Sequence, residues 1–412
     1  MANTLVTPTW VMKEVGRGYI NNLVLARNFT RTYDDQYVQS GAKVGDTVKA
    51  RKPQRFTVKD GEAIQLQDLY DETVNISLTN QKQVAFTYSS AQATLDLNDI
   101  RERYVNPAAS SLANAADVLA MADVYASVAN SVGEPGVAPD DTKTYLDAGV
   151  KLNDMSADDA KRIVVIDPSA MAEIADAAST LFNPAGVISE AFRKGQFGRD
   201  VLGIGEWAQS PNLPMHTTGT FTASTPLVNG ASQTGSTLIT DGWASGASDL
   251  HKGDVFTIAG VYSVNYGSYV STGRLQQFVV TADTSDSAGA MATLPIWPPI
   301  ITSGALQTVS NSPANNAVIT VLGATSATAG TLATTNSKQG MLWIPEAFAF
   351  VMADLMKPSA GATAHSIRSK EWGISIRWVE QYNIATDQNP SRLDILIGAA
   401  AVRPEWACRI WS

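Results

Sequence analysis

The sequence predicts an α+β protein in which a small β-barrel is set inside a mixed host domain. Charged residues almost vanish between His216 and Lys338, where Ser, Thr, Gly, Ala and Val dominate. Helical periodicity is lost over the same stretch. A β-rich block in the middle of a chain indicates a domain inserted into a surface loop of another domain. The charged residues of this block are Asp241, Asp249, Lys252, Asp254, Arg274, Asp283, Asp286 and Lys338.

Length and composition indicate a globular protein with more than one core. At 412 residues the chain exceeds what one hydrophobic core usually supports. No run of about 18 apolar residues could span a bilayer, and the N-terminus lacks the pattern of a secretory signal. We therefore expect a soluble protein that stays in the cytoplasm and has no membrane partner. The single cysteine, Cys408, excludes an internal disulfide framework.

Signatures of catalysis and of bound cofactors are missing, so we predict no enzyme activity, no catalytic residues, no cofactor and no metal. The chain has no phosphate loop, no HExxH and no GxSxG elbow. His216, His251 and His365 are far apart, which favours isolated polar histidines over a metal cluster. The cluster from Ser156 to Asp159 fits the start of a helix with Ser156 as its N-cap. The motif DTSDSAG lacks the ligand spacing of a calcium loop and is interpreted as a turn.

The N-terminal region predicts an arm followed by a projecting loop. Residues 15–25 form a short mixed segment before RNFTRTYDD, which suggests an arm that extends over the surface and binds something other than its own core. The alternation of Val74, Ile76 and Leu78, followed by that of residues 84–88, predicts a hairpin with its turn at Asn80–Gln83. The long polar stretch 51–69 resembles a projecting β-loop. Its basic cluster is interpreted as a solvated strand face, because a net charge of −9 argues against broad nucleic-acid binding.

A long helix follows, and we expect it to be mostly buried. Asn106 is the expected N-cap and Pro107 the first helical residue, with the helix continuing to about Ala129. About 22 residues make a rod of roughly 33 Å, long enough to act as the spine of a flat domain. Asn114 and Asp117 mark its narrow polar side. The expected apolar face consists of Leu112, Ala115, Ala116, Leu119, Ala122 and Ala126.

The remainder predicts an α/β domain that the β-rich block interrupts. Residues 163–166 read as a buried strand, and MAEIADAASTLF reads as a helix. Later strands at 374–378 and 393–402 are expected to complete this α/β domain. Within the block, STLIT, DVFTIAGV, LQQFVVTA, ATLPIW and NAVITVLG are short strands between turn residues, typical of a small barrel. The stretch VYSVNYGSYVSTGR between two of them is interpreted as a long loop.

Three motifs and their order resemble the major capsid proteins of tailed bacteriophages, in the coat-protein family typified by Salmonella phage P twenty-two. The motifs are FNPAGVISEAFRKGQFGRDVLGIGEWAQSPNLP at Phe182–Pro214, HKGDVFTIAGV at His251–Val261 and VRPEW at Val402–Trp406. The resemblance implies a Hong Kong 97-type capsid fold. In its terms the chain divides into an N-terminal arm at 1–40, an extended β-loop (E-loop) at 41–92, the spine helix of a peripheral P-domain at 93–135, the first part of an A-domain at 136–217, an inserted β-barrel domain at 218–338, and the completion of the A- and P-domains at 339–412.

The resemblance also implies function and partners. Copies of such a chain form the pentamers and hexamers of an icosahedral virion capsid, assembled in the host bacterial cytoplasm around double-stranded DNA that is enclosed without sequence-specific binding. A portal protein is a further partner. We expect a separate scaffolding protein, because no helical extension that could serve as a fused scaffold precedes the arm. Nothing marks a catalytic acid for covalent crosslinking, so a non-covalent shell is expected.

Interface residues follow from the resemblance by position. The β-loop contacts to adjacent subunits are Arg51, Lys52, Arg55 and Lys59, and the arm contacts to scaffold or neighbours are Lys13, Glu14 and Arg17. The contacts of the inserted-domain loop are Tyr262, Tyr266, Tyr269 and Arg274.

Two other classes of protein remain open. An encapsulin-like compartment protein would share the fold but not the inserted domain. A non-viral adhesin or binding protein would explain the Ser/Thr-rich block, with an aromatic platform formed by Trp243, Tyr262, Tyr266, Tyr269 and Trp297. An adhesin needs a secretion route, and the N-terminus shows no signal for one.

Overall fold

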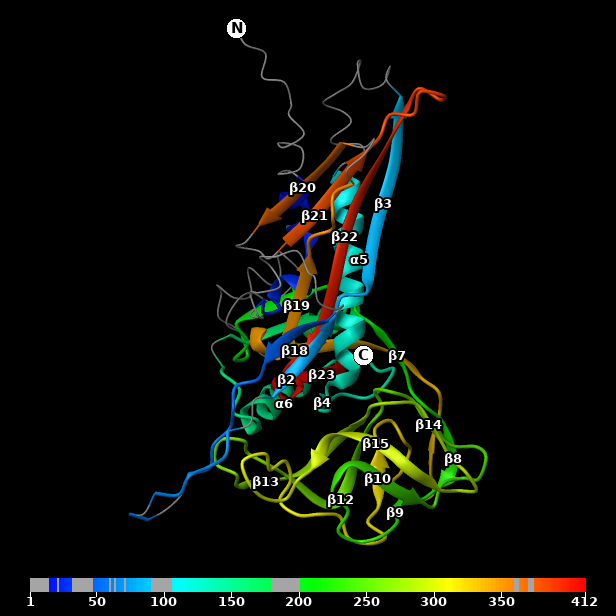
Figure 1. Ribbon diagram of the computed structural model, residues 1–412. Helices are drawn as coiled ribbons and strands as arrows, with labels where there is room; N and C mark the ends of the chain where they lie inside the picture. Colours follow the sequence, from blue (N-terminus) through cyan, green and yellow to red (C-terminus); the bar gives the residue numbers. More distant parts are fainter. Residues whose placement is uncertain are drawn as a thin grey trace. The chain divides into compact units, whose positions relative to one another are not determined.

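The computed structural model describes most of the chain and divides it into two compact units (Figure 1). The first unit is Met1–Arg51, Thr73–Asp123 and Phe348–Val402, and the second is Lys52–Glu72, Val124–Ala347 and Arg403–Ser412. Both units are therefore built from segments far apart in the sequence. The described residues are 15–20, 22–31, 47–58, 61–62, 64–69, 72–89, 106–159, 161–178, 201–358, 363–369 and 374–412.

The first unit is organised around one long strand, β22 (Gln388–Ala401). One edge of β22 pairs antiparallel with β3 (Asn80–Ser89) over the whole length of β3. The other edge pairs with β21 (Ile374–Glu380) and then with β19 (Phe348–Ala353). β20 (Thr363–Ser369) pairs with β21 and continues the sheet (Figure 1).

The predicted hairpin between residues 74 and 88 is wrong. β2 (Thr73–Ser77) pairs antiparallel with β1 (Thr47–Arg51), and β3 pairs with β22 instead. Residues 80–83, expected to turn, lie in β3. The reason is length: β22 offers β3 a ten-residue ladder, whereas folding back on β2 would offer only five residues.

The spine helix α5 (Asn106–Val124) is the long cyan helix of Figure 1. It begins at Asn106, the residue predicted as its N-cap, and it ends five residues before Ala129. The 3-10 turn η3 (Tyr125–Ser127) follows it. The predicted face is partly wrong, because Ala122 is exposed and Asp117 is fully buried. The buried side of the helix consists of Ala108, Ala109, Leu112, Ala113, Ala116, Asp117, Ala120, Met121 and Val124.

The described part of the N-terminal arm packs into the first unit, contrary to the expectation that it binds something other than its own core. Residues 15–20 are helical, and the 3-10 turn η1 (Ala26–Asn28) follows. Val15, Tyr19 and Leu23 are buried. Their spacing of four residues is the signal of a helical apolar face, which the mixed composition of the segment obscured.

An α/β sheet forms one part of the second unit. Its strands run in the order β4–β23–β18–β5–β6. The predicted strand at 163–166 is confirmed as β5. The predicted helix MAEIADAASTLF is confirmed over residues 171–178 as part of α7, which begins at Pro168, and residues 179–182 lie outside the described residues. The bounds are β4 (Ser131–Val132), α6 (Thr142–Asp154), β5 (Ile163–Ile166), α7 (Pro168–Ala178), β6 (Glu206–Gln209), β7 (Met215–Thr217), β18 (Asn336–Trp343), η4 (Pro345–Ala347), η5 (Pro404–Trp406) and β23 (Ala407–Trp411).

The prediction of which strands complete this sheet is wrong. The strands expected to complete it, at 374–378 and 393–402, are β21 and β22 of the first unit. β18 and β23 complete it instead, since β18 pairs with both β5 and β23.

The helix α6 was not predicted, and the prediction that Ser156 begins a helix is wrong. α6 ends at Asp154, and Ser156 follows with a φ of 56°.

A six-stranded sheet of the second unit lies in sequence between β7 and β18, which pair with each other. Its order is β16–β12–β13–β15–β10–β9. The two outer strands meet, because the Val228 N–H donates to the Ala317 carbonyl at 3.0 Å and the Ile319 N–H to the Pro226 carbonyl at 2.9 Å. The predicted small barrel is therefore present. Its strands are β9 (Leu227–Val228), β10 (Gly235–Asp241), β12 (Val255–Val264), β13 (Ser271–Val280), β15 (Met291–Ile300) and β16 (Ile319–Val321).

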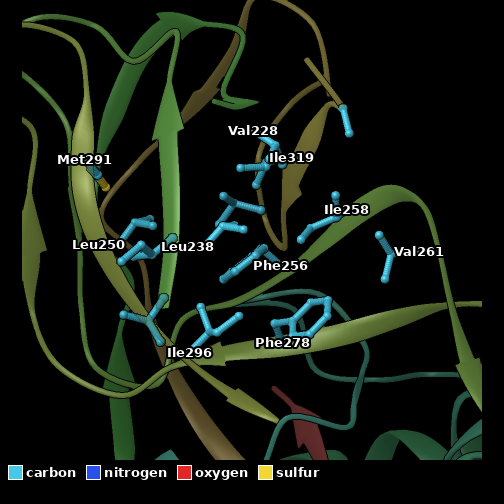
Figure 2. Close-up of a cluster of buried hydrophobic side chains, with 14 of the residues drawn as sticks. Val228, Leu238, Leu250, Phe256, Ile258, Val261, Phe278, Met291, Ile296 and Ile319 are labelled. Carbon is cyan, nitrogen blue, oxygen red and sulfur yellow. The ribbon is translucent and has the colours of Figure 1, made fainter. Parts of the chain in front are cut away.

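The barrel has a core of its own, made by alternating inward side chains (Figure 2). Phe256 and Phe278, from paired strands, stack with ring centroids 5.8 Å apart. The labelled members of this core are Val228, Leu238, Leu250, Phe256, Ile258, Val261, Phe278, Met291, Ile296 and Ile319. Two short pairs complete the block, β8 (Phe221–Ser224) with β17 (Gly330–Leu332) and β11 (Asp249–Leu250) with β14 (Thr284–Ser285).

The long loop predicted between β12 and β13 is shorter than expected. β12 continues to Val264 and β13 begins at Ser271, so only residues 265–270 connect them. Both strands carry register irregularities next to Tyr262. Small polar residues such as Ser263 are buried on the inward side of β12, so the alternation of apolar and polar residues that indicates a strand was not visible in the sequence.

Candidate assembly interfaces

The segment between β1 and β2, residues 52–72, exposes a group of large apolar side chains. Its two arms are tied together by side chains, because the Thr57 N–H and hydroxyl both donate to Gln67 Oε1 at 3.0 Å. Near the base, the Lys52 N–H donates to the Glu72 carbonyl at 2.9 Å. The exposed apolar side chains are Phe56 (57%), Val58 (94%), Ile64 (88%), Leu66 (93%) and Leu69 (76%). An apolar group this exposed is typical of a surface that a partner covers.

The basic residues predicted for this loop have different surroundings. Lys52 lies 3.8 Å from Glu72 in a partly exposed ion pair. The Arg55 guanidinium lies over the ring of Tyr266, 4.1 Å from its centroid. Arg51 is exposed at the end of β1, and Lys59 lies outside the described residues. The structure thus brings together Arg55 and Tyr266, which the sequence assigned to two separate contact regions.

A cavity of about 290 Å³ lies beside this contact, within the second unit. The Arg403 guanidinium lies 3.9 Å from the ring centroid of Trp406, and its Nη2 donates to the Pro53 carbonyl at 3.2 Å. Burial raises the pKa of Tyr266, and the nearby Glu405 carboxylate raises it further. Arg55 therefore joins the base of the loop to the connection between β12 and β13, where Tyr266 lies. Arg403 joins it to the segment before β23 through the bond to Pro53.

Among the other barrel residues predicted as contacts, Tyr269 and Arg274 make side-chain bonds within the chain. The Tyr269 hydroxyl donates to the Ala305 carbonyl at 3.0 Å, and Arg274 Nη1 lies 2.7 Å from Asp154 Oδ2. Tyr262 is 39% exposed. Trp243, one member of the alternative aromatic platform, is buried in the barrel core and packs edge-on against Phe221. Whether any of these residues meets a neighbouring subunit stays a prediction.

The sequence analysis missed a buried polar cluster around Asp254, next to the first residues of β12. His216 Nε2 lies 2.9 Å from Asp254 Oδ1, and the other carboxylate oxygen accepts the N–H groups of Gly219 at 3.0 Å and His251 at 2.7 Å. Burial lowers the pKa of His216, although the hydrogen bond to Asp254 opposes this shift. His216, expected to be an isolated histidine, thus bonds this carboxylate through its ring, whereas His251 bonds it through its backbone N–H. The one signal in the sequence that could have pointed to Asp254 is that the β-rich block contains few acidic residues.

Arg409 of β23 extends this cluster from the end of the chain. The side chain is fully buried, with Nη1 donating to the Gly253 carbonyl at 2.5 Å and Nε to Gln339 Oε1 at 2.9 Å. Its guanidinium lies 4.5 Å from the ring centroid of Trp411. Burial lowers the pKa of Arg409 to about 10. The neighbouring Cys408 is buried, and burial raises the pKa of its thiol to about 12, so it is an unreactive core side chain.

The second polar site that the sequence missed is Asp117 on α5. Its carboxylate accepts the backbone N–H groups of Val24 at 2.8 Å, Leu25 at 3.3 Å and Ala26 at 2.9 Å. Burial raises the pKa of Asp117, and the three hydrogen bonds partly offset that rise. Of the predicted arm contacts, Arg17 is exposed, and Lys13 and Glu14 lie outside the described residues.

The described residues contain no cluster of three or more side chains that could hold a metal ion. The turn predicted for the motif DTSDSAG is only partly right: Thr284 and Ser285 form β14, and the turn lies at Ala288 and Gly289, where Ser287 and Ala290 exchange backbone hydrogen bonds. Asp286 accepts the N–H groups of Gly246 at 2.9 Å, Ser248 at 3.0 Å and Gly289 at 3.0 Å, so its carboxylate organises two adjacent loops. Among the helices in the described part of the chain, none is both long and apolar enough to span a membrane.

Comparisons with solved structures give distant likenesses. A Mycobacterium phage Che8 structure is 14% identical, with 94% of this chain and 90% of that chain covered and a TM-score of 0.43. The mature capsid of bacteriophage PhiM1 is 9% identical, with 89% and 82% covered and a TM-score of 0.40. The I-domain of the CUS-3 coat protein is 28% identical, with 25% and 97% covered and a TM-score of 0.19. A search of curated proteins finds no match.

A family model described as "P22 coat protein - gene protein 5" matches residues 1–409 of this chain. The match spans both units and almost the entire sequence, and it confirms the resemblance drawn from the three motifs. The α+β architecture fits the Hong Kong 97-type capsid fold that the resemblance implied for this family. The chain belongs to the P22 coat protein family and is a structural, non-enzymatic protein of a phage capsid shell.

Proposed function

We propose that this chain assembles, with a separate scaffolding protein, into the pentamers and hexamers of an icosahedral shell that encloses phage double-stranded DNA. The site of assembly is the host bacterial cytoplasm, and a portal protein is part of the finished shell. The observation that carries this proposal is the exposed apolar loop at residues 52–72 in a chain of the coat-protein family.

The loop exposes apolar surface whose burial would stabilise an interface. Leu66 and Val58 are 93% and 94% exposed, so almost all of their apolar surface is available to a partner. Burying one such side chain stabilises an interface by about 1.5–3 kcal/mol. A closed symmetric shell repeats the same interface in every copy, so modest contacts sum to a stable assembly.

The charge of the chain supports enclosure of DNA without tight adhesion. The formal net charge is −9 at pH 7. Binding to the phosphate backbone depends on Lys and Arg that neutralise phosphates. An acidic subunit therefore allows DNA to pack against the inner wall without sticking to it.

Negative-stain electron microscopy and sedimentation of the purified chain, expressed alone and with the candidate scaffolding protein, test the proposal. The expected result is shells tens of nanometres across, or aberrant spirals that become uniform when the scaffold is present. A stable monomer under both conditions contradicts it and favours a binding protein.

Two substitutions test the role of the loop. Leu66→Asp is expected to leave the melting temperature of the subunit within about 2 °C of wild type, because surface changes rarely cost more than about 0.5 kcal/mol. It should abolish uniform shells, since the charge would be buried at the interface.

Arg55→Glu should also disturb assembly. Glu62→Gln, in the same loop, is the control and should assemble normally. Normal shells from Leu66→Asp would exclude the apolar contact, and normal shells from Arg55→Glu would remove that residue from the interface.

A further inference from the structure

The N-terminal segment is fixed to the spine helix at a buried polar point. Asp117 is 0% exposed, and its two carboxylate oxygens accept three consecutive backbone N–H groups, those of Val24, Leu25 and Ala26. All four residues belong to the first unit. A carboxylate that accepts several backbone N–H groups makes charge-assisted bonds, which are stronger than neutral ones.

These N–H groups lack a local partner of the usual kind. They precede and begin η1, where Leu25 occupies the N-cap position and makes no side-chain capping bond. Such a position normally carries Ser, Thr, Asp or Asn. Asp117 supplies the missing acceptor from a helix more than 90 residues later in the chain. Burial raises the pKa of Tyr19, the nearby Asp117 carboxylate raises it further, and Arg31 lowers it.

A second anchor lies a few residues further on. The Thr30 N–H donates to the Phe348 carbonyl at 2.9 Å, and the Phe350 N–H donates to the Thr30 carbonyl at 3.1 Å. The rings of Phe29 and Phe348 pack with centroids 5.1 Å apart. The segment from Val24 to Thr30 is therefore held at both ends, by α5 and by β19.

Apolar contact alone does not set the register of such a segment. Hydrophobic burial is non-directional, so the buried side chains of Val15, Tyr19 and Leu23 do not by themselves fix the alignment of the segment. Hydrogen bonds to one carboxylate have strict distance and angle requirements. Only one alignment of residues 24–26 satisfies all three bonds.

We propose that Asp117 is a positioning residue, which fixes the register of the N-terminal segment on the spine helix and thereby sets the contacts that the arm makes during assembly. The assembly half of this inference rests on the proposed function. The register half concerns the subunit alone and is tested separately.

Hydrogen–deuterium exchange of the soluble subunit tests the register. In wild type, the amides of Val24, Leu25 and Ala26 should exchange as slowly as those of β22. Asp117→Asn retains the shape but only one acceptor oxygen, so these amides should exchange roughly 10- to 100-fold faster. Asp123→Asn, an exposed carboxylate on the same helix, is the matched control and should leave them unchanged. Fast exchange in wild type, or equal exchange in Asp117→Asn, overturns the proposal.

Assembly with the scaffolding protein separates positioning from loss of stability. Val48→Ala is a second control, because Val48 lies in an apolar cluster of the same unit that contains no residue of the N-terminal segment. Temperatures are chosen so that Asp117→Asn and Val48→Ala are equally far below their melting points. Asp117→Asn should then give aberrant shells while Val48→Ala gives uniform ones. Equal outcomes overturn the positioning role. If wild type forms no shells, the proposed function fails together with the assembly half, while exchange still decides the register.

Discussion

His216 lies in a buried pair with Asp254, and its environment disfavours the charged imidazolium. Both side chains are at most 3% exposed. The groups facing the ring are the Asp254 carboxylate, the Tyr125 hydroxyl at 3.5 Å from Nδ1 and the Trp411 ring with its centroid at 5.3 Å. Arg409 and His251 add positive charge nearby. The folded protein therefore holds this histidine neutral at pH values where an unfolded chain would begin to protonate it.

Acidification should destabilise the subunit through His216. Its pKa is lowered in the folded state, so below about pH 6.5 the unfolded chain binds more protons, and stability falls as pH falls. Between pH 7.5 and 5.5 we expect a decrease in melting temperature that is smaller in His216→Asn. His251 provides the control of opposite sign, since its pKa is raised, first by the hydrogen bond to the Thr217 carbonyl. His251→Asn should make the decrease steeper. Equal slopes for wild type and His216→Asn would contradict this assignment.

At the scale of elements, close approach of strands decides where the β1–β2 pair lies in the first unit. Val48, Ala50, Ile76 and Leu78 pack with residues of β19 in one apolar cluster. At Gly398 of β22 this approach leaves no room for a side chain, because an added Cβ would lie 2.3 Å from the Ser77 carbonyl oxygen. A glycine in the middle of a long strand is thus required by packing.

Gly398→Ala should destabilise the first unit by about 1–3 kcal/mol, the usual cost of overpacking. Gly16→Ala is the matched control. Its Cβ would make ordinary contacts at 3.6 and 3.7 Å with Ile367, and it lies in a helix, where alanine is favoured over glycine by roughly 0.5–1 kcal/mol. Chemical denaturation of the subunit compares the two variants. A neutral Gly398→Ala would show that β2 does not lie against β22 as described.

At the scale of the whole molecule, the chain path makes both units depend on late segments. The first unit contains residues from the N-terminal segment and from Phe348–Val402, and the second contains Arg403–Ser412. The last strand, β23, lies between β4 and β18 in the α/β sheet. Long-range pairing of this kind is slow to form, because the cost of closing the loops precedes the gain from the contacts. Neither unit can complete its sheet before the C-terminal residues are available.

Arg409 should be the residue through which the last strand stabilises the second unit most. Arg409→Met preserves much of the apolar bulk but leaves the Gly253 carbonyl and Gln339 without their donor. We expect a loss of about 2–4 kcal/mol in the free energy of unfolding, from lost hydrogen bonds of a charged group and unsatisfied partners. Cys408→Ala, the adjacent buried position, should cost about 1 kcal/mol. A loss for Arg409→Met no larger than that for Cys408→Ala would contradict the assignment.

Local patterns in the sequence were enough to predict the start of the spine helix near Asn106, the strand at 163–166, and the β-rich block between β7 and β18 with its barrel strands. Its motifs also carried the family resemblance. Local patterns did not predict the partner of β3, the unit to which β21 and β22 belong, or the burial of Asp117 and His216, because these depend on long-range contacts. The physical reason is that strand pairing and burial of polar groups depend on residues up to several hundred positions away. The sequence shows that a residue inside a helix or a strand is polar or charged. Its hydrogen-bond partners come from elements elsewhere in the fold.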